Sequence, residues 1–172
     1  MIIRDETPAD AEAVRALVSA AFGDGDETAD FVAAVRREAE VCLAEVAFDG
    51  EIIVGHAQWC AAPMTVGGRE IRTAYLACLS AAPNRQRGGI GSRLVRHGLD
   101  LLRKAGFAAA SLLGDPAYYE RFGFSPDLAA RIDAPHRVRG RGFQALELEP
   151  GALAGQTVRA EYPAVVVPDG LR

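Results

Sequence analysis

The hydrophobic and polar positions of residues 90–105 repeat with the spacing of an α-helix. Ile90, Leu94 and Leu102 fall on one side of such a helix, while arginines and an aspartate fall on the other. Gly106 follows directly, and glycine is common where a helix ends. This stretch is therefore predicted to be an amphipathic helix with one buried side.

Two further helices are predicted near the N-terminus. Thr7 and Pro8 stand in the order typical of a helix start, with threonine as the cap and proline in the first turn. Apolar residues at helical spacing continue from there to residue 22. They return around Phe31 and Val35, after a break rich in glycine and aspartate.

Strand-like apolar runs separated by turn signals fill much of the remaining chain. Asp49-Gly50 is a strong hairpin signal, and Gly67-Gly68 predicts a second turn. The runs predicted to form strands are residues 1–4, 41–48, 51–59, 71–81, 107–113, 143–148 and 161–167.

The order of these elements predicts the topology of the sheet. Strand 71–81, helix 90–105 and strand 107–113 follow one another, which implies two parallel strands joined by a right-handed crossover. The preceding strands are hairpin-connected and therefore antiparallel. We expect an α/β (α+β) fold with a mixed, mostly antiparallel central sheet and one parallel strand-helix-strand unit.

The composition is typical of one folded domain spanning residues 1–172. Hydrophobic residues make up 49% and charged residues 24%, close to the average for globular chains. No apolar run approaches the ~20 residues of a membrane-spanning helix, and the N-terminus lacks a secretory pattern. Cys42, Cys60 and Cys78 stand far apart, which fits reduced thiols in a cytoplasmic protein.

Charge and histidine spacing argue against several classes of partner. The formal net charge of −4 provides no general attraction for nucleic acid or for an anionic membrane. The 3 histidines are scattered without ligand spacing, so no metal site is expected.

A glycine-rich turn, residues 83–92, lies between a predicted strand and the amphipathic helix. Glycines at 88, 89 and 91 leave no side chains in the way, so an anion could reach the unpaired amides of the first helical turn. Arg85, Arg87, Arg93 and Arg96 would add positive charge. The turn therefore predicts a pyrophosphate site.

Other phosphate-binding loops fit this turn poorly. A P-loop requires a lysine after its last glycine, and Lys104 is the only lysine in the chain. A Rossmann fingerprint requires a third glycine, which the sequence from Gly89 to Leu94 lacks. A turn without any ligand is the remaining alternative.

Two segments together resemble the GNAT superfamily of N-acetyltransferases. Residues 86–91, Gln-Arg-Gly-Gly-Ile-Gly, match the acetyl-CoA signature Q/R-x-x-G-x-G/A of that family, and Leu79 to Pro83 resemble the strand ending before it. Residues 118–124 resemble its F-Y-x-x-x-G-F segment, with Tyr118 in the Phe place. The resemblance covers about residues 1–125 and leaves an extension, 126–172.

The resemblance implies helices on both faces of the sheet and acetyl-CoA as co-substrate. In the family, main-chain groups of the splayed strand hold the pantetheine arm, and the turn amides hold the pyrophosphate. Carried over to this sequence, the cofactor-binding residues are Leu79, Ala81, Gln86, Arg87, Gly88, Gly89, Ile90, Gly91 and Ser92.

The resemblance also implies catalytic roles. Tyr119 occupies the position that often serves as general acid, and a tyrosine hydroxyl is protonated at neutral pH. Tyr118 is expected to be a packed aromatic. The strand 71–81 contains no carboxylate, so the base is either His56 or a water relay. Cys78 has no evident activating partner, which favours direct transfer within a ternary complex.

The expected function is acetyl transfer from acetyl-CoA to a primary amine, of a small molecule or a protein. The alternatives are a non-catalytic CoA-binding or sensing module and an interaction domain with a merely structural turn. The acidic cluster of residues 24–30 could attract a cationic amine or simply cap a helix. The basic run 131–141 could contact the 3′-phosphate of CoA or an acidic acceptor, or be a solvated loop. C-terminal strands that pair between subunits would give a homodimer.

Overall fold

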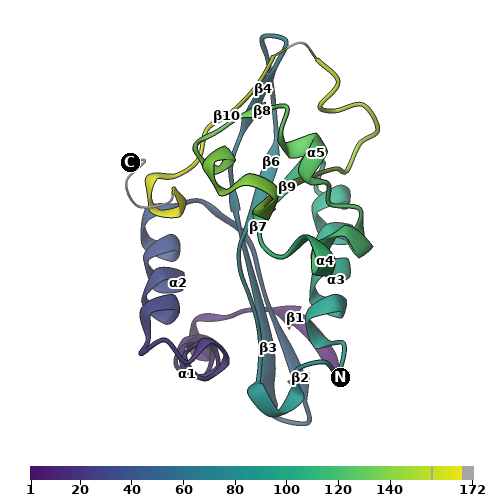
Figure 1. Cartoon of the computed structure of the whole chain (residues 1–172). Helices are drawn as coiled ribbons and strands as arrows, with labels where there is room; N and C mark the ends of the chain where they lie inside the picture. Colours follow the sequence, from purple (N-terminus) through teal and green to yellow (C-terminus); the bar gives the residue numbers. More distant parts are fainter. Residues whose placement is uncertain (156, 168–172) are drawn as a thin grey trace.

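A computed structural model describes residues 1–155 and 157–167 and centres on a six-stranded sheet (Figure 1). Neighbouring strands are antiparallel except for β6 and β7, which are parallel, as predicted. The strand order is β1 (Ile2–Asp5), β2 (Val41–Asp49), β3 (Ile52–Ala61), β6 (Thr73–Ala81), β7 (Ala109–Leu113) and β9 (Phe143–Glu147).

A smaller, four-stranded sheet lies at one end of the large one, at the top of Figure 1. Its strand order is β5 (Arg69–Ile71), β4 (Met64–Val66), β10 (Val158–Ala160) and β8 (Ile132–Asp133). The predicted turn at Gly67-Gly68 joins β4 to β5, and both glycines have the positive φ that such a turn requires.

Two strand predictions need correction. Residues 71–81 are not one strand, because Ile71 ends β5 in the small sheet and β6 begins at Thr73 in the large one. Residues 161–167 are not a strand either, because they contain a 3₁₀ turn, η5 (Ala164–Val166). Pro163 precedes η5 and has no amide hydrogen to offer a strand partner.

Helices cover both faces of the large sheet, as the resemblance implied. In Figure 1, α1 (Ala11–Phe22) and α2 (Glu27–Glu38) lie on one side and α3 (Ile90–Lys104) on the other. Thr7 and Asp10 form a capping box around η1 (Pro8–Asp10), which leads into α1. The shorter elements are η2 (Pro83–Arg85), α4 (Pro116–Tyr119), η3 (Glu120–Phe122), α5 (Pro126–Ala129) and η4 (Pro135–Gly142).

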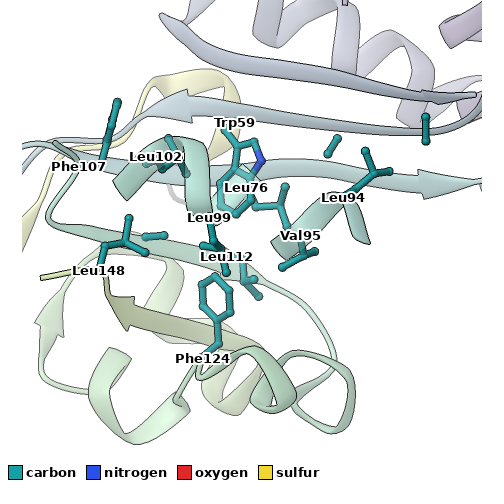
Figure 2. Packing of buried hydrophobic residues seen from close by; sticks show 14 of the residues in the cluster. Trp59, Leu76, Leu94, Val95, Leu99, Leu102, Phe107, Leu112, Phe124 and Leu148 are labelled. Carbon is teal, nitrogen blue, oxygen red and sulfur yellow. The ribbon is translucent and has the colours of Figure 1, made fainter. Parts of the chain in front are cut away.

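The main hydrophobic core lies between α3 and the sheet (Figure 2). Leu94 and Leu99 point from the helix toward Trp59 and Leu76, and Phe124 closes the cluster from the far side. Gly98 permits this approach, since a Cβ there would lie 2.8 Å from Trp59 Nε1. This packing holds the start of α3 against the end of β6.

Candidate active site

The parallel strands β6 and β7 separate halfway along β6. Their pairing runs from Thr73 beside Ala109 to Leu76 beside Leu112 and goes no further. Beyond that point β6 continues to Ala81, paired only with β3. The register with β3 also skips Ala77, which marks a β-bulge. The second half of β6 therefore presents one main-chain edge to a gap in the sheet.

A cavity of about 570 Å³ opens between this edge and the start of α3, and we call it the α3 cavity. It is lined by Leu79, Ser80, Ala81, Arg85, Gln86, Arg87, Gly89, Ile90, Gly91, Ser92, Tyr118, Tyr119 and Arg121. All the residues predicted to bind a cofactor are here except Gly88, which lies beside the lining in the turn. The sequence interpretation did not single out Ser80 or Arg121.

Backbone conformation explains the glycines of this turn. Gly89 caps α3 with φ +82, and Arg87 also adopts a left-handed conformation with φ +63. At Gly91, a Cβ would lie 2.7 Å from the hydroxyl oxygen of Tyr118. Because the first turn of a helix leaves its amides without helical partners, the turn presents N–H donors toward the cavity.

The arginines near the turn have different partners. Arg85 pairs with Asp49 at 2.8 Å, and the guanidinium of Arg121 lies 4.8 Å from the ring centre of Tyr118. Arg87 and Arg121 line the α3 cavity, whereas Arg93 and Arg96 do not. Part of the positive charge at the cavity therefore comes from Arg121 of η3, the 3₁₀ turn after α4. Arg121 is distant from the glycine-rich turn in the sequence, so its position along the chain did not indicate this role.

The two neighbouring tyrosines have distinct surroundings. The Tyr119 ring packs on Gly114 and Phe124, and burial raises the pKa of its hydroxyl well above the ordinary value. That hydroxyl therefore stays protonated and able to donate. Tyr118 is not simply a packed aromatic, because its hydroxyl lies at Gly91 in the α3 cavity.

A second cavity of about 580 Å³, the α2 cavity, lies on the opposite face of the sheet. It is lined by Phe31, Tyr75, Leu76, Ala77, Leu113, Gly114, Arg139, Gly142, Val165, Val166 and Val167. Gly114 lines this cavity while touching the ring of Tyr119, which lines the other. The two cavities therefore approach each other at the gap between β6 and β7.

A family model described as acetyltransferase (GNAT) domain matches residues 2–126. The chain belongs to the GNAT acetyltransferase family. The uncharacterized N-acetyltransferase YhbS of Escherichia coli K12 is 36% identical over 165 residues, covering 94% of this chain and 96% of YhbS. YjhQ of the same strain, also an uncharacterized N-acetyltransferase, is 34% identical over 155 residues, which cover 85% of this chain and 84% of YjhQ.

Solved GNAT structures agree with this fold. YhbS of Escherichia coli in complex with CoA superimposes with a TM-score of 0.83 and 32% identity, covering 98% of this chain and 93% of that one. A GNAT acetyltransferase of Brucella melitensis in complex with acetyl-CoA gives a TM-score of 0.73 and 33% identity, covering 95% of this chain and 96% of that one. The mixed sheet with helices on both faces is thus a GNAT fold, as the two motifs indicated.

In this GNAT chain, the histidine considered as a base is far from solvent. His56 is fully buried, lines neither cavity, and lies with Nε2 3.0 Å from Oε2 of Glu6. Arg36 of α2 pairs with the other oxygen of Glu6. His56 is thus part of a buried charged cluster beneath α2 rather than a group facing an acceptor.

Cys78 and the acidic cluster of residues 24–30 also lie outside the lining of both cavities. Cys78 is buried, and desolvation raises the pKa of its thiol to about 12, so it is not an activated nucleophile. In the acidic cluster, Arg15 pairs with Asp26 and Asp30, and Asp24 accepts a hydrogen bond from the amide of Thr28. These carboxylates cap and brace the helices, and none lines the α2 cavity.

Within residues 1–155 and 157–167, no helix has the length and apolarity needed to span a bilayer. In the same residues, no group of three or more histidine, cysteine, aspartate or glutamate side chains is arranged to hold a metal ion.

Proposed function

We propose that this GNAT enzyme transfers the acetyl group of acetyl-CoA to a primary amine by direct attack within a ternary complex. The observation that carries the proposal is the gap between β6 and β7, with one cavity on each face of the sheet. Two substrates that enter from opposite faces would meet there without a covalent enzyme intermediate.

The α3 cavity is the proposed acetyl-CoA site. Its shape suits a diphosphate, because Gly89 and Gly91 keep side chains away from the amides at the start of α3. Leu79 and Ala81 lie on the half of β6 that has lost its β7 partner, so their main chain can hydrogen-bond an extended arm. The relatives in complex with CoA and acetyl-CoA support this assignment.

The proposed chemistry needs one proton donor and one neutral amine. Bound acetyl-CoA would supply the acetyl group as a thioester. The amine nitrogen forms a bond to the carbonyl carbon, the carbon–sulfur bond breaks, and the hydroxyl of Tyr119 donates a proton to the sulfur. The attacking nitrogen releases one proton to water, and Tyr119 regains a proton from water, so acetyl-CoA and the amine become CoA and the N-acetylated amine. Because Tyr119 has a raised pKa, its hydroxyl is available as a donor throughout the neutral range.

The α2 cavity is the proposed amine site, and the extension 126–172 completes it. Arg139, Gly142 and Val165 come from that extension, while Phe31 and Ala77 come from the part that matches the family model. We therefore propose that residues 1–172 act as one domain in which the extension shapes the acceptor site rather than forming a separate module.

Calorimetry and a thiol-release assay test this function together. We expect heat on titration with both acetyl-CoA and CoA, and CoA release when a broad panel of amines is added. Binding without any release would favour the alternative of a non-catalytic CoA-binding or sensing module. Absence of heat at high micromolar ligand would contradict the proposal and leave the glycine turn as a structural feature.

A homodimer built through the C-terminal strands remains a prediction. β10 is paired on both sides, with β4 and β8 of the same chain, so it is not free for a second subunit. β9 ends the large sheet, and an isolated bridge between Ser125 and Ala145 occupies part of its outer edge. Light scattering of the purified chain would decide its oligomeric state.

A further inference from the structure

The α2 cavity has a mostly apolar wall, and its described lining includes a single charged side chain. Phe31, Leu113 and the valines of η5 form much of its surface. Among the described residues that line it, Arg139 is the only one with a charge, and none is a carboxylate. A pocket of this kind suits an apolar molecule that carries one anionic group.

The guanidinium of Arg139 has no ion-pair partner among the described residues, unlike that of Arg141. Its neighbour Arg141 pairs with Glu120 and Asp127, at 3.6 and 3.3 Å. No carboxylate in the described part of the chain lies within ion-pair distance of Arg139, although the side chain is exposed and lines the cavity. A guanidinium in this position offers a planar fork of donors that matches a carboxylate.

The described residues around Arg139 add no negative charge to the cavity. Behind the cavity wall, His136 packs on Tyr75 and its Nε2 lies 2.8 Å from the carbonyl oxygen of Val166. Burial lowers the pKa of His136, and the charge of Arg139 acts in the same direction, so the imidazole stays neutral. The electrostatic field in the cavity therefore comes mainly from Arg139 and favours an anion over a cation.

Because the described lining contains no carboxylate, it also limits which amines the cavity can bind. A lysine side chain or a polyamine enters as a cation and finds no acidic partner in the described lining. A peptide α-amino group ionises near pH 8, so about a third of it is neutral at pH 7.5, against about 0.1% for a lysine amine. An α-amino group can thus enter the cavity uncharged without a side-chain base.

We propose that the acceptor is a small apolar molecule with a peptide-type α-amino group and a carboxylate, such as a short peptide, and that Arg139 binds the carboxylate. This inference rests on the proposed acetyl transfer and adds the substrate class. Polyamines and lysine side chains are excluded by the same charge that attracts the carboxylate.

Matched amines test the substrate class. Leucyl-glycine and leucyl-glycinamide share the amine and the apolar side chain and differ in the carboxylate, while leucine tests a free amino acid. We expect kcat/KM for leucyl-glycine to exceed that for the amide about tenfold or more, as loss of a charged hydrogen-bonded pair implies. Spermidine and Nα-acetyl-lysine should release CoA still more slowly.

Variants of Arg139 connect the preference to this side chain. Arg139→Gln should raise KM for leucyl-glycine, leave the amide unaffected and leave calorimetric acetyl-CoA binding unchanged. Arg139→Glu should shift the preference toward spermidine. Arg159→Gln, an exposed arginine of β10 that does not line the cavity, is the control and should behave like the wild type.

The possible failures are distinct. If acetyl-CoA does not bind, the proposed function fails. If acetyl-CoA binds and spermidine or Nα-acetyl-lysine is the better acceptor, the function stands and the substrate class is overturned. Equal loss of both leucyl substrates in Arg139→Gln also overturns it. If no amine releases CoA, leucyl-glycine titrated into CoA-saturated protein decides the inference, and absence of heat there contradicts it.

Discussion

The hydroxyl oxygen of Tyr118 lies 2.7 Å from the position that a Cβ on Gly91 would occupy. The glycine-rich turn and the tyrosine segment are thus in contact, although 26 residues lie between Gly91 and Tyr118 along the chain. This contact ties the two family motifs into one cavity. A side chain at Gly91 would therefore collide with Tyr118 inside this cavity.

Gly91→Leu is expected to abolish acetyl-CoA binding. The new side chain would collide with Tyr118 and cover the amides at the start of α3, where the diphosphate is proposed to bind. Calorimetry measures the loss. Asp100→Leu, an exposed change later in the same helix, is the control and should bind normally. Wild-type affinity in Gly91→Leu would contradict the proposed site.

Tyr119→Phe should preserve acetyl-CoA binding and lower kcat by about 10²–10⁴-fold, the range typical of a lost general acid. Burial raises the pKa of this hydroxyl, so in the wild type the acid form should persist to about pH 10 without a falling limb from Tyr119. Steady-state rates between pH 6 and about 10 measure both effects.

Tyr118→Phe is the matched control for that variant. It removes the neighbouring hydroxyl, which lies at Gly91, and should leave kcat within a few-fold of the wild type. If Tyr118→Phe were the slower enzyme, the general acid would have to be reassigned to Tyr118.

Gly114→Ala should disturb Tyr119 without touching any polar group. A Cβ at Gly114 would lie 2.7 Å from Cδ2 of the Tyr119 ring, so the ring must move. We expect a stability loss of about 1–3 kcal/mol from overpacking, and a lower kcat. Gly142→Ala, with its nearest contact at 3.7 Å, is the control for overpacking and should leave the free energy of unfolding unchanged. Urea unfolding and turnover provide the two measurements.

Glu6→Gln should reduce stability rather than catalysis. Glu6 is nearly buried and contacts both His56 and Arg36, so its neutral replacement removes the carboxylate that pairs with the partly exposed guanidinium of Arg36. Breaking a fully buried pair costs about 3–5 kcal/mol, and the partial exposure of Arg36 makes the expected loss smaller than that. Turnover per folded molecule should stay close to that of the wild type. A large drop in kcat with a shifted acidic limb would instead identify the His56–Glu6 pair as the base.

Cys78→Ala should keep full turnover, because direct transfer does not use this thiol. The variant also changes the response to alkaline pH. The Cys78 thiol has a pKa of about 12 in the folded chain and about 8.5 when unfolded, so the unfolded state loses its proton first. That difference lowers the free energy of unfolding as pH rises above about 8.5, by up to about 1.4 kcal/mol per unit. The slope should be smaller in Cys78→Ala, as measured by urea unfolding at pH 8 and about 10.

Local patterns were sufficient to predict most of the elements and the glycine-rich turn. The Thr7–Asp10 cap, the Asp49-Gly50 hairpin and the glycines at 89 and 91 depend on backbone conformation within a few residues. Such short-range constraints are readable in one sequence. They were misread at Pro163, where a proline without an amide hydrogen precedes η5 in place of a predicted strand.

Tertiary packing decided where cavities lie between those elements and which charged side chains line them. The gap beyond Leu76, the burial of His56 against Glu6, and the presence of Arg139 and Phe31 in one cavity all join segments far apart in the chain. Periodicity reports which side of an element is apolar, but it carries no distance between elements. Cavities and ion pairs arise from those distances, so only the folded chain could reveal the cavity that we propose as the acceptor site.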